Sequence, residues 1–180
     1  MGIKKFSIND KPIVCLTAYD YKTACFVDNY CDVVLVGDSV GMALYGDKTT
    51  TNVTLDVMIR HGQSVRKGLK KSYMVVDMPK NTYKNKIQAF KNAKKIITQT
   101  KCDAVKLEGG KKIINIVNYL IRKKIKVVGH IGLLPQSINN PKDYRVLGKE
   151  KKDRNKIYLD FKYLENSGVD FIILESVKKN

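Results

Sequence analysis

The sequence has no long apolar segment. Its apolar runs, such as Val33 to Val36 and Phe171 to Leu174, are far short of the roughly 20 residues that a helix needs to cross a bilayer. The opening residues, MGIKKFSINDKP, contain no apolar stretch of the kind found in secretory signals. These absences predict a cytoplasmic protein with no membrane partner.

Cysteine pairs are also missing. The four cysteines, Cys15, Cys25, Cys31 and Cys102, form no C-x-x-C pair. Three of them lie inside or beside apolar segments, where a reduced thiol packs as a small hydrophobic group. We therefore expect no disulfide framework. A catalytic thiol stays open as an alternative, although no cysteine has a histidine partner nearby in the sequence.

Arginine and acidic residues are scarce. Lys and Arg number 34 against 17 Asp and Glu, for a net charge of +17, yet only five of the basic residues are Arg. Proteins that read bases and phosphates usually rely on arginine forks and stacked aromatic residues. Lysine here recurs beside Asn and Ile throughout, which indicates a coding bias. Nucleic acid is therefore not expected as a partner, and a basic nucleic-acid-associated protein is the weakest alternative.

The sequence does contain a regular alternation of short apolar runs with longer amphipathic segments. The apolar runs predict six strands: Pro12 to Thr17, Val33 to Gly37, Tyr73 to Asp77, Ala104 to Leu107, Val127 to Gly129 and Phe171 to Leu174. The segments between them predict five helices: Tyr21 to Tyr30, Leu55 to Gly68, Lys84 to Thr100, Lys111 to Lys123 and Asn155 to Ser167. This order predicts a parallel sheet with helical crossovers. No linker divides the chain, so residues 1–180 are expected to form one domain.

Ionisable residues recur where the predicted strands end. They are Asp38, which precedes Ser39, then Asp77, Lys106 with Glu108, His130 and Glu175. A single Asp at a strand end is commonly a helix cap or a turn residue. Five consecutive strands with such residues instead predict an active site at the carboxyl edge of a (β/α) barrel. The long irregular stretch from Gly132 to Lys152 is expected to be functional as well.

Three of these residues, Asp38, Asp77 and Glu108, are carboxylates from neighbouring strands. Hard oxygen ligands in small number suit Mg²⁺, which keeps open positions for substrate and water. Without a cation the carboxylates would repel one another. We therefore expect them to converge on one Mg²⁺ site, directly or through water.

The other polar residues suit a substrate. Ser39, Lys106 and His130 fit an anionic or carbonyl compound, and Lys106 points to the same side of its strand as Glu108. Glu175 follows four apolar residues, and desolvation there would raise its pKa and fit it for general acid–base work. The reaction implied is proton abstraction next to a carbonyl, with a metal stabilising the enolate.

Six motifs, in order and spacing, resemble the ketopantoate hydroxymethyltransferase (3-methyl-2-oxobutanoate hydroxymethyltransferase) family. They are LTAYD (Leu16 to Asp20), LVGDSVGM (Leu35 to Met42), VDMP (Val76 to Pro79), VKLEGG (Val105 to Gly110), GHIGLLPQS (Gly129 to Ser137) and LES (Leu174 to Ser176). The resemblance implies a Mg²⁺-dependent TIM (β/α)₈ barrel of pantothenate and coenzyme A biosynthesis. Such an enzyme transfers a hydroxymethyl group from 5,10-methylenetetrahydrofolate to 3-methyl-2-oxobutanoate, giving 2-dehydropantoate.

The resemblance also implies roles for individual residues. By motif, Asp38, Asp77 and Glu108 resemble the family's metal-site residues, and Glu175 resembles its proton-abstracting base. The residues expected to bind substrate are Asp38, Ser39, Asp77, Lys106 and His130. Members of the family typically assemble from many identical subunits, so a homo-oligomer is expected.

The sequence departs from the family pattern in three places. Lys80-Asn81 stands where an aromatic residue usually follows Asp77-Met78-Pro79, and residues 50–53 lack the usual Leu-Pro. Pro141-Lys142-Asp143 replaces small glycines in the loop 139–149. These departures bear on folate contacts and loop closure more than on metal binding.

The number of predicted strands falls short of a complete barrel. A (β/α)₈ barrel typically takes about 250 residues, whereas only six strands are predicted here. We therefore expect an incomplete barrel of about six βα units, truncated at its carboxyl end, with two exposed sheet edges. An inactive or complementation-dependent fragment of the enzyme is the main alternative to an active enzyme.

Overall fold

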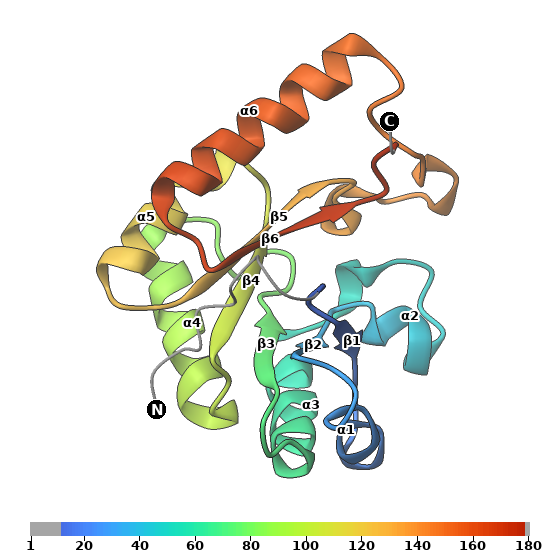
Figure 1. The fold of residues 1–180 in the computed structure, drawn as a ribbon, viewed down its shortest axis with the longest axis vertical. Helices are drawn as coiled ribbons and strands as arrows, with labels where there is room; N and C mark the ends of the chain where they lie inside the picture. The colour runs from blue at the N-terminus through green and yellow to red at the C-terminus, as the bar shows by residue number, and fades with distance from the viewer. Residues whose placement is uncertain (1–11, 179–180) are drawn as a thin grey trace.

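A computed structural model describes residues 12–178, which contain one six-stranded sheet (Figure 1). Its strands are β1 (Cys15–Thr17), β2 (Val33–Val36), β3 (Tyr73–Asp77), β4 (Ala104–Glu108), β5 (Val127–Gly132) and β6 (Phe171–Glu175). They lie in the order β1-β2-β3-β4-β5-β6, and every neighbouring pair is parallel. All six predicted strands are therefore present in the predicted arrangement.

Six α-helices lie between the strands: α1 (Tyr21–Val27), α2 (Val40–Tyr45), α3 (Leu55–Gly68), α4 (Lys86–Thr100), α5 (Ile114–Arg122) and α6 (Lys151–Ser167). Four 3₁₀ turns accompany them: η1 (Thr50–Asn52), η2 (Lys111–Ile113), η3 (Pro135–Ser137) and η4 (Pro141–Asp143). Each helix of residues 12–178 is too short or too polar to cross a membrane.

The sequence did not predict helix α2. Its six residues, VGMALY, contain no charged residue, so they show none of the apolar and polar alternation by which an amphipathic helix is recognised. Ser39 precedes the helix without capping it through its side chain. The other five helices are present. Helix α6 begins at Lys151 rather than at the predicted Asn155.

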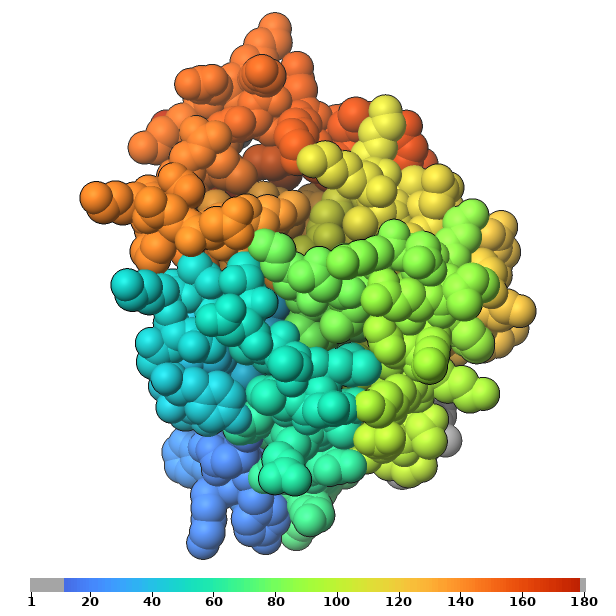
Figure 2. All heavy atoms as spheres, turned by 180° about the vertical axis from the view of Figure 1, so that it is seen from behind, coloured from blue at the N-terminus to red at the C-terminus, as the bar shows by residue number. Residues whose placement is uncertain are grey.

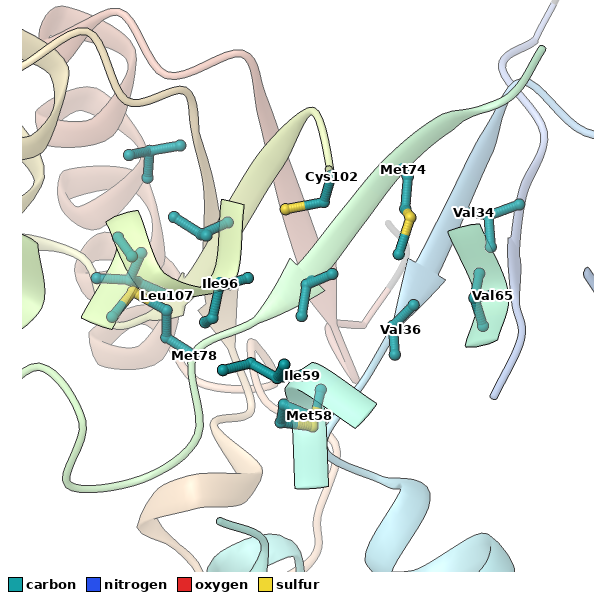
Figure 3. Packing of buried hydrophobic residues seen from close by; sticks show 14 of the residues in the cluster. Val34, Val36, Met58, Ile59, Val65, Met74, Met78, Ile96, Cys102 and Leu107 are labelled. Atoms are coloured by element: carbon teal, nitrogen blue, oxygen red, sulfur yellow. The ribbon is translucent and has the colours of Figure 1, made fainter. Parts of the chain in front are cut away.

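The two faces of the sheet carry different side chains because successive residues of a strand point to opposite sides. One face packs against the helices, where Val34 and Val36 of β2 contact the same buried cluster as Met58 and Val65 of α3 (Figure 3). The opposite face carries a smaller apolar cluster: Val33, Val75, Ala104 and Val128. The large helix-facing cluster therefore supplies most of the core.

Ionisable residues continue the row of the smaller cluster toward the carboxyl ends of the strands. Asp77 lies two residues beyond Val75, Lys106 two beyond Ala104, and His130 two beyond Val128. The register aligns Asp77 with Lys106 and Glu108 with His130. The period of the strands thus directs these side chains away from the helices and into the space at the strand ends.

Strands β1 and β6 are the two edges of the sheet within residues 12–178. Beside β6, an apolar cavity of about 390 Å³ lies between the strand and helix α6, and its lining includes Ile157, Phe161 and Leu174. Leu174 is 54% exposed. Figure 2 shows the molecule from behind, hollowed beside the orange segment that leads into α6.

Candidate active site

One pocket at the carboxyl ends of strands β2 to β6 brings the predicted site residues together. Its volume is about 250 Å³. The predicted residues that line it are Asp38, Ser39, Asp77, Lys106, Glu108, His130 and Glu175. The larger apolar cavity beside β6 shares no lining residue with this pocket and has none of the carboxylates. The chemistry-bearing residues therefore lie in the smaller pocket.

Lys106 lies in the middle of the charged groups. Its Nζ lies 3.2 Å from Asp77 Oδ2, 3.9 Å from Glu108 Oε1 and 3.1 Å from His130 Nδ1. Burial works against its charge, but the neighbouring carboxylates outweigh burial and raise the pKa of the Lys106 ammonium. Lys106 therefore provides a fixed positive charge in a site shielded from water.

His130 connects the buried carboxylate Glu108 to Glu175. Its Nδ1 lies 3.4 Å from Glu108 Oε1, and its Nε2 lies 3.3 Å from Glu175 Oε2. Because Nδ1 accepts from the Lys106 ammonium, the proton of a neutral imidazole belongs on Nε2, which faces Glu175. Burial opposes a second proton, but Glu108 and Glu175 outweigh it and raise the pKa of His130.

Asp38 and Asp77 are two buried acidic residues joined by a hydrogen bond. The Asp38 backbone N–H donates to Asp77 Oδ2 at 3.1 Å. Burial raises the pKa of Asp38 to about 7, and the nearby charge of Asp77 adds to the effect. Burial also raises the pKa of Asp77, whose Oδ1 is buried without a hydrogen-bond partner. Such a pair favours a proton or a cation between its members.

The raised pKa of Asp38 predicts how stability depends on pH when no metal is present. The folded protein holds the Asp38 proton more tightly than an unfolded chain, in which the pKa is about 3.9. Ionisation therefore costs stability as the pH rises from about 4 to about 7. Asp38→Asn removes this cost, so with EDTA at pH 8 we expect it to raise the free energy of unfolding by about 1–4 kcal/mol.

Urea unfolding at pH 8 and pH 4.5 measures this difference. The gain from Asp38→Asn should shrink toward zero at the lower pH, where wild-type Asp38 is already protonated. Asp56→Asn is the matched control, because Asp56 is 82% exposed and pairs with Lys95 outside the pocket. A gain of equal size at both pH values would show that ionisation of Asp38 is not its cause.

Sequence reasoning did not assign a role to Gln136 or Tyr83. Gln136 Nε2 donates to Asp38 Oδ2 at 2.7 Å, and its backbone N–H donates to Glu108 Oε2 at 3.0 Å. The Tyr83 hydroxyl donates to Gln136 Oε1 at 2.5 Å. Gln136 belongs to the quoted GHIGLLPQS motif, but a neutral residue in a loop gives no charge or periodic signal by which its role is recognised.

Tyr19 is a third residue to which sequence reasoning assigned no role. Its hydroxyl and Ser39 Oγ lie 2.5 Å apart, in hydrogen-bond contact. Its backbone carbonyl contacts His61 Nδ1 at 2.6 Å, and Tyr45 contacts the other nitrogen of the same ring. Burial raises the pKa of the Tyr19 phenol, so the hydroxyl stays protonated and orients Ser39 at the mouth of the pocket.

The expected burial of Glu175 is wrong. Its side chain is 38% exposed, although four apolar residues precede it. Those residues form an edge strand, and alternate side chains of a strand face opposite sides. The apolar run therefore does not enclose Glu175, whose position is set by Gly132 on β5 and by His130.

Two solved structures with similar folds are distant from this chain in sequence. A phosphonopyruvate hydrolase, solved in complex with oxalate and Mg²⁺, superposes with a TM-score of 0.68 at 9% identity, covering 92% of this chain and 59% of that one. A 2,3-dimethylmalate lyase of the PEP mutase/isocitrate lyase superfamily gives 0.66 at 12% identity, covering 91% and 57%. At such identities the likeness concerns the fold alone. The superpositions confirm the predicted fold, an incomplete TIM-type barrel.

Sequence relatives are much closer. The 3-methyl-2-oxobutanoate hydroxymethyltransferase of Pelagibacter ubique is 54% identical over 172 residues, covering 96% of this chain and 66% of that protein. The enzyme of the same name from Rhizobium etli is 46% identical over 166 residues, covering 92% and 61%. The chain thus spans somewhat less than two thirds of the length of these relatives.

The family model described as ketopantoate hydroxymethyltransferase matches residues 2–180. This match covers the strands, the loops and all seven predicted residues of the pocket. Taken with the identity to the two named relatives, it shows that the chain belongs to the ketopantoate hydroxymethyltransferase family.

Proposed function

We propose that this chain provides the active site for transfer of a hydroxymethyl group from 5,10-methylenetetrahydrofolate to 3-methyl-2-oxobutanoate, giving 2-dehydropantoate. The observation that carries the proposal is the convergence of seven residues on one pocket in a chain of this family. Assembly into a homo-oligomer in the cytoplasm belongs to the same proposal. The reaction is part of pantothenate biosynthesis.

Binding of the oxoacid is assigned to the charged and hydroxyl groups of the pocket. Lys106 supplies a buried positive charge for the carboxylate or the developing enolate oxygen. Ser39, oriented by Tyr19, supplies a hydroxyl at the pocket mouth. A volume of about 250 Å³ suits a small branched oxoacid, which leaves the one-carbon donor to approach from the open side.

Proton removal is assigned to Glu175. Its carboxylate lines the same pocket and lies 3.3 Å from His130 Nε2, whose proton favours the ionised form of the carboxylate. The base takes the C3 hydrogen of the oxoacid, and the resulting enolate carbon forms the new bond to the one-carbon unit. Both C–N bonds of the donor's methylene carbon break, water supplies the hydroxyl group, and tetrahydrofolate leaves. Partial exposure of Glu175 gives it access to substrate and to exchangeable solvent protons.

The donor set fits a divalent cation of the Mg²⁺ type. Asp77 Oδ1 is buried without a hydrogen-bond partner, and Asp38 lies beside Asp77. Within residues 12–178, no group of three or more His, Cys, Asp or Glu side chains is placed to hold a metal by itself. Asp38 and Asp77 would therefore bind directly and Glu108 through water, since Mg²⁺ commonly keeps several waters. Bound Mg²⁺ would stabilise negative charge on the ketone oxygen.

Asp77→Asn should weaken binding of Mn²⁺, used as a paramagnetic probe for this site. The substitution removes half of the charge that two direct ligands would supply, so we expect the affinity to fall by about 10-fold or more. Electron paramagnetic resonance of free Mn²⁺ during titration measures the change. Asp56→Asn is again the control. If Asp77→Asn and the wild-type protein bound Mn²⁺ with equal affinity, the cation would not bind at Asp77.

A transfer assay tests the proposed function itself. We define the chimera as this chain joined to the part of the Pelagibacter ubique relative that lies beyond the matched region. With oxoacid, methylenetetrahydrofolate and Mg²⁺, it should form 2-dehydropantoate, detected by nuclear magnetic resonance. A folded chimera that binds Mn²⁺ but forms no product would contradict the proposal.

A complementation-dependent fragment is the second candidate function. It is favoured by the position of β6 at the edge of the described sheet and by the apolar cavity of about 390 Å³ beside it. Further βα units would pair with that edge and fill that cavity. In this alternative the same residues act only when a complementary chain supplies those units.

A further inference from the structure

We propose that Tyr83 and Gln136 form a positioning pair that holds Asp38 and Glu108 in the arrangement required for binding the cation and the oxoacid. This inference rests on the proposed function, because it assigns the pair to the same pocket. Neither residue is expected to touch reacting atoms. Their effect is exerted through the two carboxylates.

Gln136 contacts carboxylates that come from two different strand ends. Its side-chain Nε2 donates to Asp38 Oδ2 at 2.7 Å, while its backbone N–H donates to Glu108 Oε2 at 3.0 Å. The residue is only 5% exposed, so water does not compete for these bonds. Hydrogen bonds to charged groups in such surroundings are stronger than neutral ones. Gln136 therefore fixes one oxygen of each carboxylate.

Tyr83 helps to hold the Gln136 amide in one orientation. A glutamine amide fits a site in two orientations, which only its hydrogen-bond partners distinguish. Nε2 here contacts two acceptors, Asp38 Oδ2 and the Met78 carbonyl at 2.9 Å, while the Tyr83 hydroxyl donates to Oε1. The flipped amide would place Oε1 against both acceptors, neither of which can donate to it. Asp38 and the Met78 carbonyl thus select the orientation, and the bond from the Tyr83 hydroxyl to Oε1 holds the amide in it.

The same hydroxyl reaches Glu108 as well. The Glu108 backbone N–H donates to the Tyr83 oxygen at 3.4 Å, so Tyr83 and Gln136 both contact the residue that ends β4. Tyr83 is held in turn by the turn that precedes it, where Thr82 bonds to the Pro79 carbonyl and Asn92 of α4 donates to the Thr82 carbonyl. Two loops, after β3 and after β5, therefore meet over the carboxylates.

Two of the places where the sequence departs from the family pattern also lie in these two loops. Lys80, in the loop after β3, donates through Nζ to Asn139 Oδ1 in the loop after β5 at 3.1 Å. The Lys80–Asn139 contact is exposed, whereas the bond between Tyr83 and Gln136 is partly buried. The pair thus adds a second, less exposed contact between the two loops.

Two substitutions remove the pair with little change of shape. Gln136→Met keeps the length of the side chain and the backbone bond to Glu108 but removes the amide. Tyr83→Phe keeps the ring and removes only the hydroxyl. Tyr119→Phe is the matched control: Tyr119 is a half-buried tyrosine on α5, packed edge-to-face on Phe90, outside the pocket.

Mn²⁺ titration followed by electron paramagnetic resonance tests the pair without turnover, in the 180-residue chain and in the chimera. We expect Gln136→Met to weaken Mn²⁺ binding by about 10-fold, as removal of a residue that orients a metal ligand usually does. Tyr83→Phe should weaken it by several-fold. The double variant should weaken binding by less than the product of the two single effects, because the hydroxyl acts in large part through the amide and only otherwise through its contact with the Glu108 backbone N–H. Tyr119→Phe should bind as the wild type does.

Three results would overturn the inference: affinities within twofold of wild type, effects of the two substitutions that multiply, or no Mn²⁺ binding by the folded wild-type chain. If Gln136→Met does not fold, the Mn²⁺ affinity of Tyr83→Phe is compared with that of Tyr119→Phe, and equal affinities would overturn the inference. A different result would contradict the proposed function but not the positioning pair: the chimera shows the expected effects on Mn²⁺ binding yet forms no 2-dehydropantoate. In an active chimera, Tyr83→Phe should raise the KM for oxoacid more than it lowers kcat.

Discussion

Glu175→Gln is expected to slow exchange of the C3 hydrogen of 3-methyl-2-oxobutanoate with solvent deuterium by about 10²–10⁴-fold, the range typical of a general base. Glutamine keeps the shape of the side chain and its place beside His130 but cannot accept the proton. Binding of Mn²⁺ and of the oxoacid should stay nearly unchanged, since Asp38, Asp77 and Lys106 are untouched. The exchange needs no folate, so it isolates the proton transfer from the later step.

The chimera is the form in which to measure this exchange by proton nuclear magnetic resonance. Glu165→Gln is the control, because Glu165 is an exposed glutamate of α6 that pairs with Lys162. If Glu175→Gln exchanged deuterium as fast as the unsubstituted chimera, Glu175 would not be the base. His130, which lies between Glu175 and Glu108, would then be the next candidate.

The 180-residue chain alone should form 2-dehydropantoate at least about 10²-fold more slowly than the chimera. Glu175 ends β6, the edge strand of the described sheet, and its side chain is 38% exposed. Further strands would pair with β6 and fix the position of Glu175. Catalytic geometry tolerates little error, and a misplacement of about 1 Å can cost about 10²-fold in rate.

The Pelagibacter ubique relative provides the matched control for this comparison. Trimmed to the region that matches this chain, it should lose activity to a similar extent. Mixing the 180-residue chain with the separately expressed remainder of the relative should restore part of the rate if complementation is possible. Equal rates for the chain alone and the chimera would show that the described strands are sufficient.

Much of the fold was predictable because strands and helices leave different periods in the sequence. Six apolar runs, such as those around Val34, Val75 and Val128, predicted the six strands, and the polar residues after the runs predicted the residues that line the pocket. Gln136 and Tyr83 could not be assigned in the same way. They are neutral residues in loops, and their importance comes from a contact between segments 53 residues apart, which no local pattern encodes.

The burial of Glu175 could not be inferred from its neighbours in the sequence. Four apolar neighbours in sequence indicated a desolvated carboxylate, yet in a strand they alternate between the two faces. Leu174, the residue immediately before it, is 54% exposed. Burial at a sheet edge depends on what packs there from elsewhere, so the sequence of the strand alone does not determine it.

The measurement that tests the central claim most directly is exchange of the C3 hydrogen in the unsubstituted chimera, with no folate present, in Mg²⁺ and again in excess EDTA. If the pocket of Asp38, Asp77, Lys106 and Glu175 enolises the oxoacid with a bound cation, exchange should proceed in Mg²⁺ and fall by about 10²-fold or more in EDTA, returning when Mg²⁺ is restored. Absence of exchange in a folded chimera that binds Mn²⁺, or exchange that EDTA leaves unchanged, would contradict the account.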